Sequence, residues 1–323
     1  MRQTTRSRWM GSLFLAALLL GLPARAGDGL AVDEIMVQYP AGFTKVLAWD
    51  VAPFLADPEL GEGVIEPLKA ANHPLVGLVR TIEFFRIPPQ QVAYVAHGQG
   101  PDVSSFSVIA GPGLPHLMGA LQGLRAAAQA PGSPFTHFEL TNIDGLPVAF
   151  VGGAFGPVAI EWAYIPTEGA LWIGTEVAFQ PGRPDVERLR ATTQLMIDKL
   201  LGRRSAGTFS ELHTAVQVRG GQIAFVRTSA PGERPQEPGE QAMAFRVEVT
   251  PEGVYGTFAL RFESVAAAQA AVERLRAGTS PYLAQDLYRA ELVRVQRTGR
   301  TLNVDVRADL TGLVGLLMLV MPF

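Results

Sequence analysis

Several pairs of short segments resemble each other in the same order along this sequence, and that shared order limits what the chain can fold into. Residues Ala120–Ala126 align with Ala271–Ala277, and each segment ends a stretch with helical apolar spacing. Segments that recur in the same order along a chain are typical of a duplicated structural unit. We therefore predict an internal duplication. Four further matches support it: Ser105–Ile109 with Thr257–Phe262, Gln91–Val95 with Gln222–Val226, Phe138–Leu140 with Ala290–Leu292, and Trp49–Ala52 with Thr175–Ala178.

Both copies have the same predicted order of strands and helices. The order is strand, helix, strand, strand, helix, strand and one extra strand, which is the split βαβ, or ferredoxin-like, arrangement. Apolar and polar residues alternate in strands such as Ala244–Thr250, as expected for an antiparallel sheet with one buried face. The predicted fold class is therefore α+β, with two tandem ferredoxin-like modules (βαββαβ-type) whose sheets are mostly antiparallel.

The element boundaries follow from periodicity, caps and breakers. Pro58, Pro67 and Pro74 divide the first helical region, because proline lacks a backbone donor and clashes with the preceding turn. Ser264 and Gly278 are suited to begin and end a later helix. The predicted elements of the first copy are Thr44–Val51, short helices within Pro53–Phe85, Val92–Ala96, Ser104–Ala110, Leu114–Ala128, Thr136–Thr141 and Pro147–Val151. Those of the second are Ala170–Phe179, Asp185–Leu201, Gln222–Thr228, Val254–Phe262, Val265–Ala277, Leu287–Arg297 and Thr301–Val306.

The beginning of the chain has the pattern of a secretory signal peptide. Basic residues precede an uncharged apolar run, and a proline and an Ala-Arg-Ala cleavage site follow it. The run is too short to span a bilayer, although an uncleaved anchor is the alternative. We predict general secretion to the periplasm or the medium, with a signal peptide at 1–26, a first module at 27–165 and a second at 166–323. A hairpin of Val158–Ile165 and Ala170–Phe179 joins the modules.

Composition and charge exclude several classes of protein. The chain is 48% hydrophobic, which excludes disorder throughout, and it has no cysteine, which excludes disulfides, thiol nucleophiles and cysteine metal sites. Removal of the signal peptide takes away Arg2, Arg6, Arg8 and Arg25, so the net charge falls from −3 to −7. An acidic mature chain with scattered basic residues is not expected to bind nucleic acid or anionic membranes.

Catalytic motifs are missing from the sequence. It contains no nucleophile elbow, P-loop, zinc-protease helix, EF-hand loop or dinucleotide-binding glycine pattern. Imidazole and carboxylate groups could bind zinc or iron or act as acid and base. The candidate residues for such a site are His97, Asp102, His137 and Glu139. In a split βαβ sheet the strands that carry His97 and His137 lie on opposite edges. We therefore expect these four residues to have structural roles, and we expect no cofactor. The remaining histidines are His73, His116 and His213.

Two further segments stand out by composition. Ser229–Gln241 is polar and rich in proline, and we predict a mobile loop there. The uncharged segment Leu310–Phe323 is too short to cross a membrane, so no transmembrane span is expected after signal cleavage. It could pack into the core of the second module, or it could present an apolar surface to a partner, a lipid or the membrane face. The candidate interaction residues are Leu313, Leu316, Leu317 and Leu319.

These features favour an exported, non-catalytic binding or interaction protein of the bacterial cell envelope. It would bind a partner protein or an apolar ligand between or beneath its sheets, and no nucleic acid. The first alternative is an extracytoplasmic hydrolase or metal-dependent enzyme with a site at His97, Asp102, His137 and Glu139. The second is an envelope scaffold that docks through its apolar C-terminus.

Overall fold

The computed structural model describes most of the chain after residue 35. The chain divides into Met1–Leu30 and Ala31–Phe323, and all described residues belong to the second unit. The predicted signal peptide and three histidines, His73, His116 and His213, lie outside the described residues. The described residues are 36, 38–71, 74–84, 87–88, 91–111, 117–179, 181–203, 223–228, 237–250, 253–283 and 291–320.

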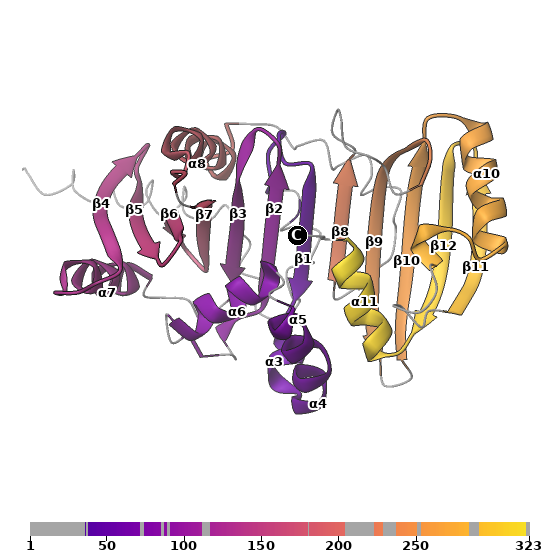
Figure 1. Ribbon diagram of the computed structural model, residues 1–323, viewed down its shortest axis with the longest axis horizontal. Coiled ribbons are helices and arrows are strands. Elements are labelled where there is room, and N and C mark those ends of the chain that lie inside the picture. Colours follow the sequence, from indigo (N-terminus) through magenta and orange to yellow (C-terminus); the bar gives the residue numbers. More distant parts are fainter. Residues whose placement is uncertain are drawn as a thin grey trace, which may run out of the picture. The chain divides into compact units, whose positions relative to one another are not determined.

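The described strands form one sheet of twelve strands in which every neighbouring pair is antiparallel. The order across the sheet is β11-β12-β10-β9-β8-β1-β2-β3-β7-β6-β5-β4, as Figure 1 shows. The strands are β1 Lys45–Asp50, β2 Tyr94–Gly100, β3 Val103–Ala110, β4 Phe135–Ile143, β5 Leu146–Phe155, β6 Val158–Thr167, β7 Ala170–Phe179, β8 Ile223–Thr228, β9 Glu240–Thr250, β10 Gly253–Phe262, β11 Glu291–Thr298 and β12 Thr301–Ala308.

The prediction of two tandem ferredoxin-like modules is wrong. β1 and β8 pair in the middle of the sheet, with Lys45 opposite Arg227 and Trp49 opposite Ile223, so the two halves share one sheet. In separate modules these apolar strands would each leave an edge of unpaired backbone groups, and pairing them removes both edges. β7, which we assigned to the second copy, lies between β3 and β6. The residue limits of the modules stay a prediction.

The two halves of the sheet nevertheless connect their strands in the same order. From the central pair outward lie three strands, β1-β2-β3 in one half and β8-β9-β10 in the other. A helix then leads to the outermost strand: α7, Leu117–Gln129, leads to β4, and α10, Val265–Arg276, leads to β11. The chain returns inward to the third strand, and a last helix follows, α8 (Val186–Leu200) or α11 (Leu310–Val320). The duplication itself stays a prediction.

A helical layer built from short pieces precedes β2. Pro58 and Pro74 each begin a helix as predicted, whereas Pro67 lies in the first turn of α5 and does not break the helical run of Pro58–Ala70. The pieces are α3 Ala52–Ala56, α4 Pro58–Leu60, the π-helical η1 Gly61–Ile65, α5 Glu66–Ala70 and α6 Pro74–Phe84, and a 3₁₀ turn, η3, follows later at Pro281–Leu283.

The sheet has two faces with different cover. The core face carries Leu47, Val95, Phe225 and Phe258, and it forms one buried apolar cluster with α3, η1, α5, α6, α7, α10 and α11. The opposite face, here called the α8 face, carries Phe106 and the glycines that face it. A Cβ on Gly174 would lie 2.5 Å from Phe106 Cε2 and 2.8 Å from Leu189 Cδ1 of α8, so glycine is needed to seat this helix.

The apolar C-terminal segment forms α11. Asp309 accepts a hydrogen bond from the Gly312 amide at 2.7 Å, and this contact caps the start of the helix. Leu313 and Leu317 are fully buried, whereas the side chains of Leu316 and Leu319 are outside the described part. Among the described helices, none has the length and hydropathy needed to cross a membrane.

Candidate functional site

The four residues singled out from the sequence do not meet. His97 lies on β2 and Asp102 in the turn after it, whereas His137 and Glu139 lie on β4. Four strands separate β2 from β4, and at about 4.8 Å per spacing the two strands are about 24 Å apart. Within the described ranges, no group of three His, Asp or Glu residues could hold a metal ion.

His97 is a buried residue, and both of its ring nitrogens are hydrogen-bonded. Gln99 Nε2 lies 2.9 Å from His97 Nε2, and His97 Nδ1 lies 2.8 Å from Ser107 Oγ. Because an amide nitrogen can only donate, His97 Nε2 accepts and Nδ1 donates to the serine hydroxyl. This is a satisfied structural histidine.

His137 pairs instead with Glu161 of β6, across the intervening strand β5. The residue between them is Gly152, and His137 Nε2 lies 3.3 Å from Glu161 Oε2. A Cβ on Gly152 would lie 2.4 Å from His137 Cε1. The contact between His137 and Glu161 therefore requires a glycine at position 152. Burial raises the pKa of the Glu161 carboxyl, and the nearby charges of His137 and Arg190 oppose this rise.

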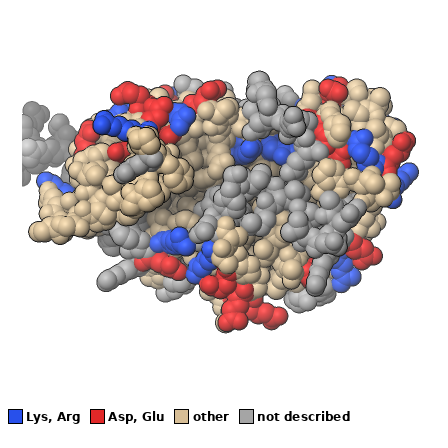
Figure 2. All heavy atoms as spheres, in the orientation of Figure 1, with Lys and Arg blue, Asp and Glu red and all other residues tan. Residues whose placement is uncertain are grey.

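Two arginines of α8 bind the other carboxylates of this face. Arg188 donates from Nε and Nη2 to the two oxygens of Glu176, at 2.8 and 2.6 Å. Arg190 donates to Glu139 at 2.6 Å, and its guanidinium lies 4.3 Å from the centre of the Phe150 ring. Figure 2 shows acidic and basic side chains gathered over the α8 region at the upper left. These pairs hold α8 on the sheet, and both carboxylates already have an arginine partner.

A second polar cluster is buried in the other half of the molecule. Arg227 of β8 pairs with Glu240 and donates to the Tyr282 hydroxyl at 3.0 Å, and Tyr282 donates to Glu240 at 2.5 Å. Arg274 of α10 donates to Glu237 at 2.8 Å. Burial, followed by the Glu240 charge, raises the pKa of Tyr282.

This cluster was not predicted from the sequence. Glu237 and Glu240 belong to the segment Ser229–Gln241, which we predicted to be a mobile loop, but both carboxylates are fully buried. Residues 229–236 of that segment lie outside the described part. The composition of the segment gave no sign that its end would be buried.

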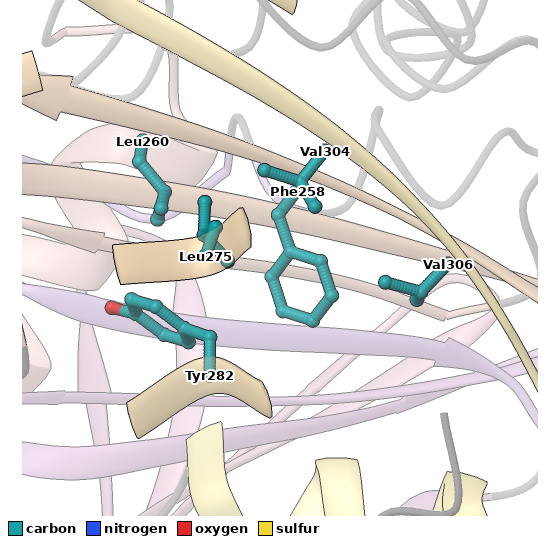
Figure 3. Close-up of a pocket in the computed structure, with 6 residues that line it drawn as sticks. All are labelled: Phe258, Leu260, Leu275, Tyr282, Val304 and Val306. Carbon is teal, nitrogen blue, oxygen red and sulfur yellow. The ribbon is translucent and has the colours of Figure 1, made fainter. Parts of the chain in front are cut away.

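The apolar space beside this cluster is not a ligand pocket. Figure 3 shows the side chains of β10, β12, α10 and η3 that surround it, with the Tyr282 ring among them. The gap between these side chains has no room for a water molecule. Its lining residues are therefore core residues: Phe258, Leu260, Leu275, Tyr282, Val304 and Val306.

An apolar surface is exposed at one end of β5, β6 and β7, on the core face. Phe179 is 72% exposed, Val177 50% and Phe155 41%, and the ladder aligns Phe155 with Val158 and Phe179. Next to them, the Trp162 ring packs edge-on against those of Phe155 and Phe135, with centroids 5.8 and 6.2 Å away. We call this surface the sheet-end patch; it consists of Phe135, Phe155, Val158, Ile160, Trp162, Val177 and Phe179.

The strands that form most of the sheet-end patch carry almost no charge. β5, β6 and β7 contain no Lys or Arg, and their two carboxylates, Glu161 and Glu176, lie on the α8 face. A soluble chain rarely leaves a contiguous apolar surface bare, and such surfaces mark sites of association. The patch is the feature of the described residues that points most directly to a function.

Comparison with known proteins adds a distant likeness. No family model matches the sequence, and no curated protein does. Among solved structures, crystal form I of TP0453 aligns with a TM-score of 0.46 at 12% identity, covering 88% of this chain and 96% of that chain. Crystal form IV of TP0453 gives the same TM-score and identity, covering 87% and 94%. A likeness this distant carries no argument about function.

Proposed function

We propose that this protein is an exported, non-catalytic interaction protein of the bacterial cell envelope, which binds an apolar segment of a partner protein on the sheet-end patch. The observation that carries the proposal is the exposure of Phe155, Val177 and Phe179 side by side on one face. Covering apolar side chains is worth about 25 cal/mol per Å² of surface removed from water. The signal-peptide pattern at residues 1–26 supports export.

Catalysis and small-ligand carriage have less support. The candidate residue His137 pairs with Glu161, and Glu139 pairs with Arg190. His97 is buried on another strand. The apolar gap near Phe258 is too narrow for a ligand. Two of the candidate leucines of the C-terminus, Leu313 and Leu317, are core residues, so we place the interaction on the sheet-end patch instead.

The charge of the molecule favours a protein partner. The patch offers no cation to phosphate groups, and the mature chain is acidic after loss of its signal peptide. Nucleic acids and anionic lipid surfaces are bound chiefly through Lys and Arg. An uncharged apolar protein segment fits the patch best.

Site-specific photo-crosslinking in the envelope of the native host tests this proposal. Benzoylphenylalanine is placed at Phe179 in one variant and at Val293 of β11, which is 61% exposed, in the control. We expect one discrete protein adduct from position 179 and none from position 293. Equal labelling from both positions, or no protein adduct from position 179, would overturn the proposal.

A further inference from the structure

The sheet ends in two edge strands, β4 and β11, and their outer backbone groups have no strand partner in the described part of the chain. An edge strand offers a row of free N–H and C=O groups to any other strand. Proteins protect such edges with charges, prolines and bulges, so the sequence of each edge shows whether pairing is discouraged.

The β11 edge is protected. Arg294 and Arg297 lie within eight residues of strand, and the register shifts between Leu292 and Arg294. A second β11 strand in antiparallel orientation would bring arginines of the two copies close together. Like charges opposite each other destabilise strand pairing.

The β4 edge differs in each of these respects. It has nine residues, Phe135–Ile143, without Lys, Arg or Pro, and its one irregularity is at the start, between Phe135 and His137. The side chains of His137 and Glu139 are about half exposed, at 46% and 47%. The strand is therefore long, regular over most of its length and open to solvent.

β4 is also complementary to itself. Two β4 strands can pair antiparallel with Phe138 opposite Phe138 of the second copy, and this register places His137 of each copy opposite Glu139 of the other. His137 and Glu139 lie on the α8 face and Phe138 on the core face, as their β5 partners Gly152, Phe150 and Val151 show. Each dimer would thus gain two cross-strand His137–Glu139 contacts, beside the pairs that these residues make with Glu161 and Arg190 in their own copy, and one aromatic pair.

We propose that a second copy of this chain binds along β4 in this register, which makes a two-fold symmetric dimer with one continuous sheet. A two-fold contact uses the β4 edge of each copy once, so the assembly closes at two copies. The two sheet-end patches would lie on the same face of the joined sheet. This inference goes beyond the proposed function, and neither depends on the other.

Cysteine crosslinking reads the register directly, since the chain contains no cysteine. Phe138→Cys places two thiols directly opposite each other, at a Cα separation of about 4.5–5.5 Å that a disulfide can span. Leu140→Cys, on the same face and 48% exposed, is the matched control. In the proposed register its two Cα atoms lie about 14 Å apart, beyond disulfide reach. We expect a disulfide dimer from the first variant only; crosslinking of Leu140→Cys at an equal rate would overturn the register.

Sedimentation velocity tests the dimer without a substitution at Phe138, the residue on the two-fold axis. The unmodified mature protein is expected to sediment as a dimer at tens of micromolar, and Glu139→Lys to weaken association at least tenfold. Arg294→Glu on the other edge should leave it unchanged. A monomer at 100 µM overturns the proposal, as does weakening by Arg294→Glu alone. Photo-crosslinking at Phe179 detects the partner protein of the sheet-end patch independently of the β4 dimer. Either proposal can therefore fail while the other is still tested.

Discussion

The two halves of the sheet use the same order of connections but differ in the number of strands that their crossover helix must cover. In the C-terminal half, β12 alone lies between the strands that α10 connects, β10 and β11. In the N-terminal half, β5, β6 and β7 all lie between β3 and β4, which α7 connects. A helix with its side chains is about 10 Å wide, and neighbouring strands lie about 4.8 Å apart. One helix therefore covers about two strands.

This difference explains where the sheet-end patch lies. α10 packs on β10, β11 and β12, and the aromatic residues beneath it, Phe258 and Tyr282, are buried. α7 packs on β4 and β6, and Phe155 at the end of β5 and Phe179 at the end of β7 stay exposed. The two additional strands of the N-terminal half are thus the source of its exposed apolar surface.

The halves also differ in how they hold their charges. In the C-terminal half, Glu237 and Glu240 are fully buried, and their arginines, Arg227 and Arg274, are 8% and 30% exposed. In the N-terminal half, the pairs under α8 include partners that are 40–47% exposed. Buried pairs are costly to break, and exposed pairs contribute little. We therefore expect matched substitutions to have unequal effects in the two halves.

Truncation of one phenylalanine in each half should give the largest contrast. Phe258 is 2% exposed and stacks on Phe245 with ring centroids 4.4 Å apart, whereas Phe179 is 72% exposed. Phe258→Ala should lower the free energy of unfolding by about 3–5 kcal/mol. Phe179→Ala should change it by less than about 0.5 kcal/mol. Urea unfolding measures both, and a loss of several kcal/mol at Phe179 would mean that the patch is part of the core.

Removal of one carboxylate from each half is the next test. Glu240→Ala removes the carboxylate that pairs with the buried Arg227 and should cost about 3–5 kcal/mol. Glu139→Ala leaves Arg190 exposed to water and should cost at most about 1 kcal/mol. Equal losses in urea unfolding would contradict the division into buried and exposed pairs.

A smaller loss is expected where α8 is seated on the sheet. Gly174→Ala drives a methyl group into Phe106 and Leu189 and should cost about 1–3 kcal/mol. Gly123→Ala on α7 is the control, because a Cβ added there would meet no neighbouring element within 4 Å. Alanine should stabilise the helix at that position by about 0.5–1 kcal/mol. A neutral Gly174→Ala would show that α8 packs loosely.

The smallest effect concerns Glu161 and depends on pH. Burial raises the pKa of Glu161 in the folded chain, so its protonation favours folding. The stabilisation is present at low pH and is lost as the pH rises through the folded-state pKa. Glu161→Gln does not titrate, and solvent screening limits the difference to a few tenths of a kcal/mol. The variant should be slightly more stable than the parent at pH 7, and this advantage should shrink on acidification. Urea unfolding across the pH range measures it, and an advantage that grows on acidification would contradict this sign.

The local structure could be predicted from the sequence, but the arrangement of the sheet could not. Periodicity and caps located α8, with Asp185 accepting from the Arg188 amide, and α10, with Ser264 accepting from the Ala267 amide. Gly169, at φ 72°, lies in the turn of the predicted hairpin, directly before Ala170. The pairing of β1 with β8 depends on residues far apart in the sequence, and alternation shows which face a strand buries but not its neighbour.

The candidate surface was missed for a related reason. The sequence of β5, LPVAFVGGAF, is apolar at positions of both faces, which is the pattern of a fully buried strand. Whether Phe155 is covered depends on the reach of α7, which the sequence does not encode locally. Likewise, the burial of Glu240 depends on Arg227 and Tyr282, which lie on other elements.

Cysteine accessibility in the purified protein and in the envelope tests the central claim most directly. Phe179→Cys and the β11 control Val293→Cys each carry the only thiol of the chain, and both positions are exposed in the structure. In the purified protein, both should react with a maleimide at similar rates. In the native envelope fraction, we predict at least tenfold protection at position 179 and none at position 293. Equal reactivity of the two positions in the envelope would contradict the claim that the sheet-end patch binds a partner.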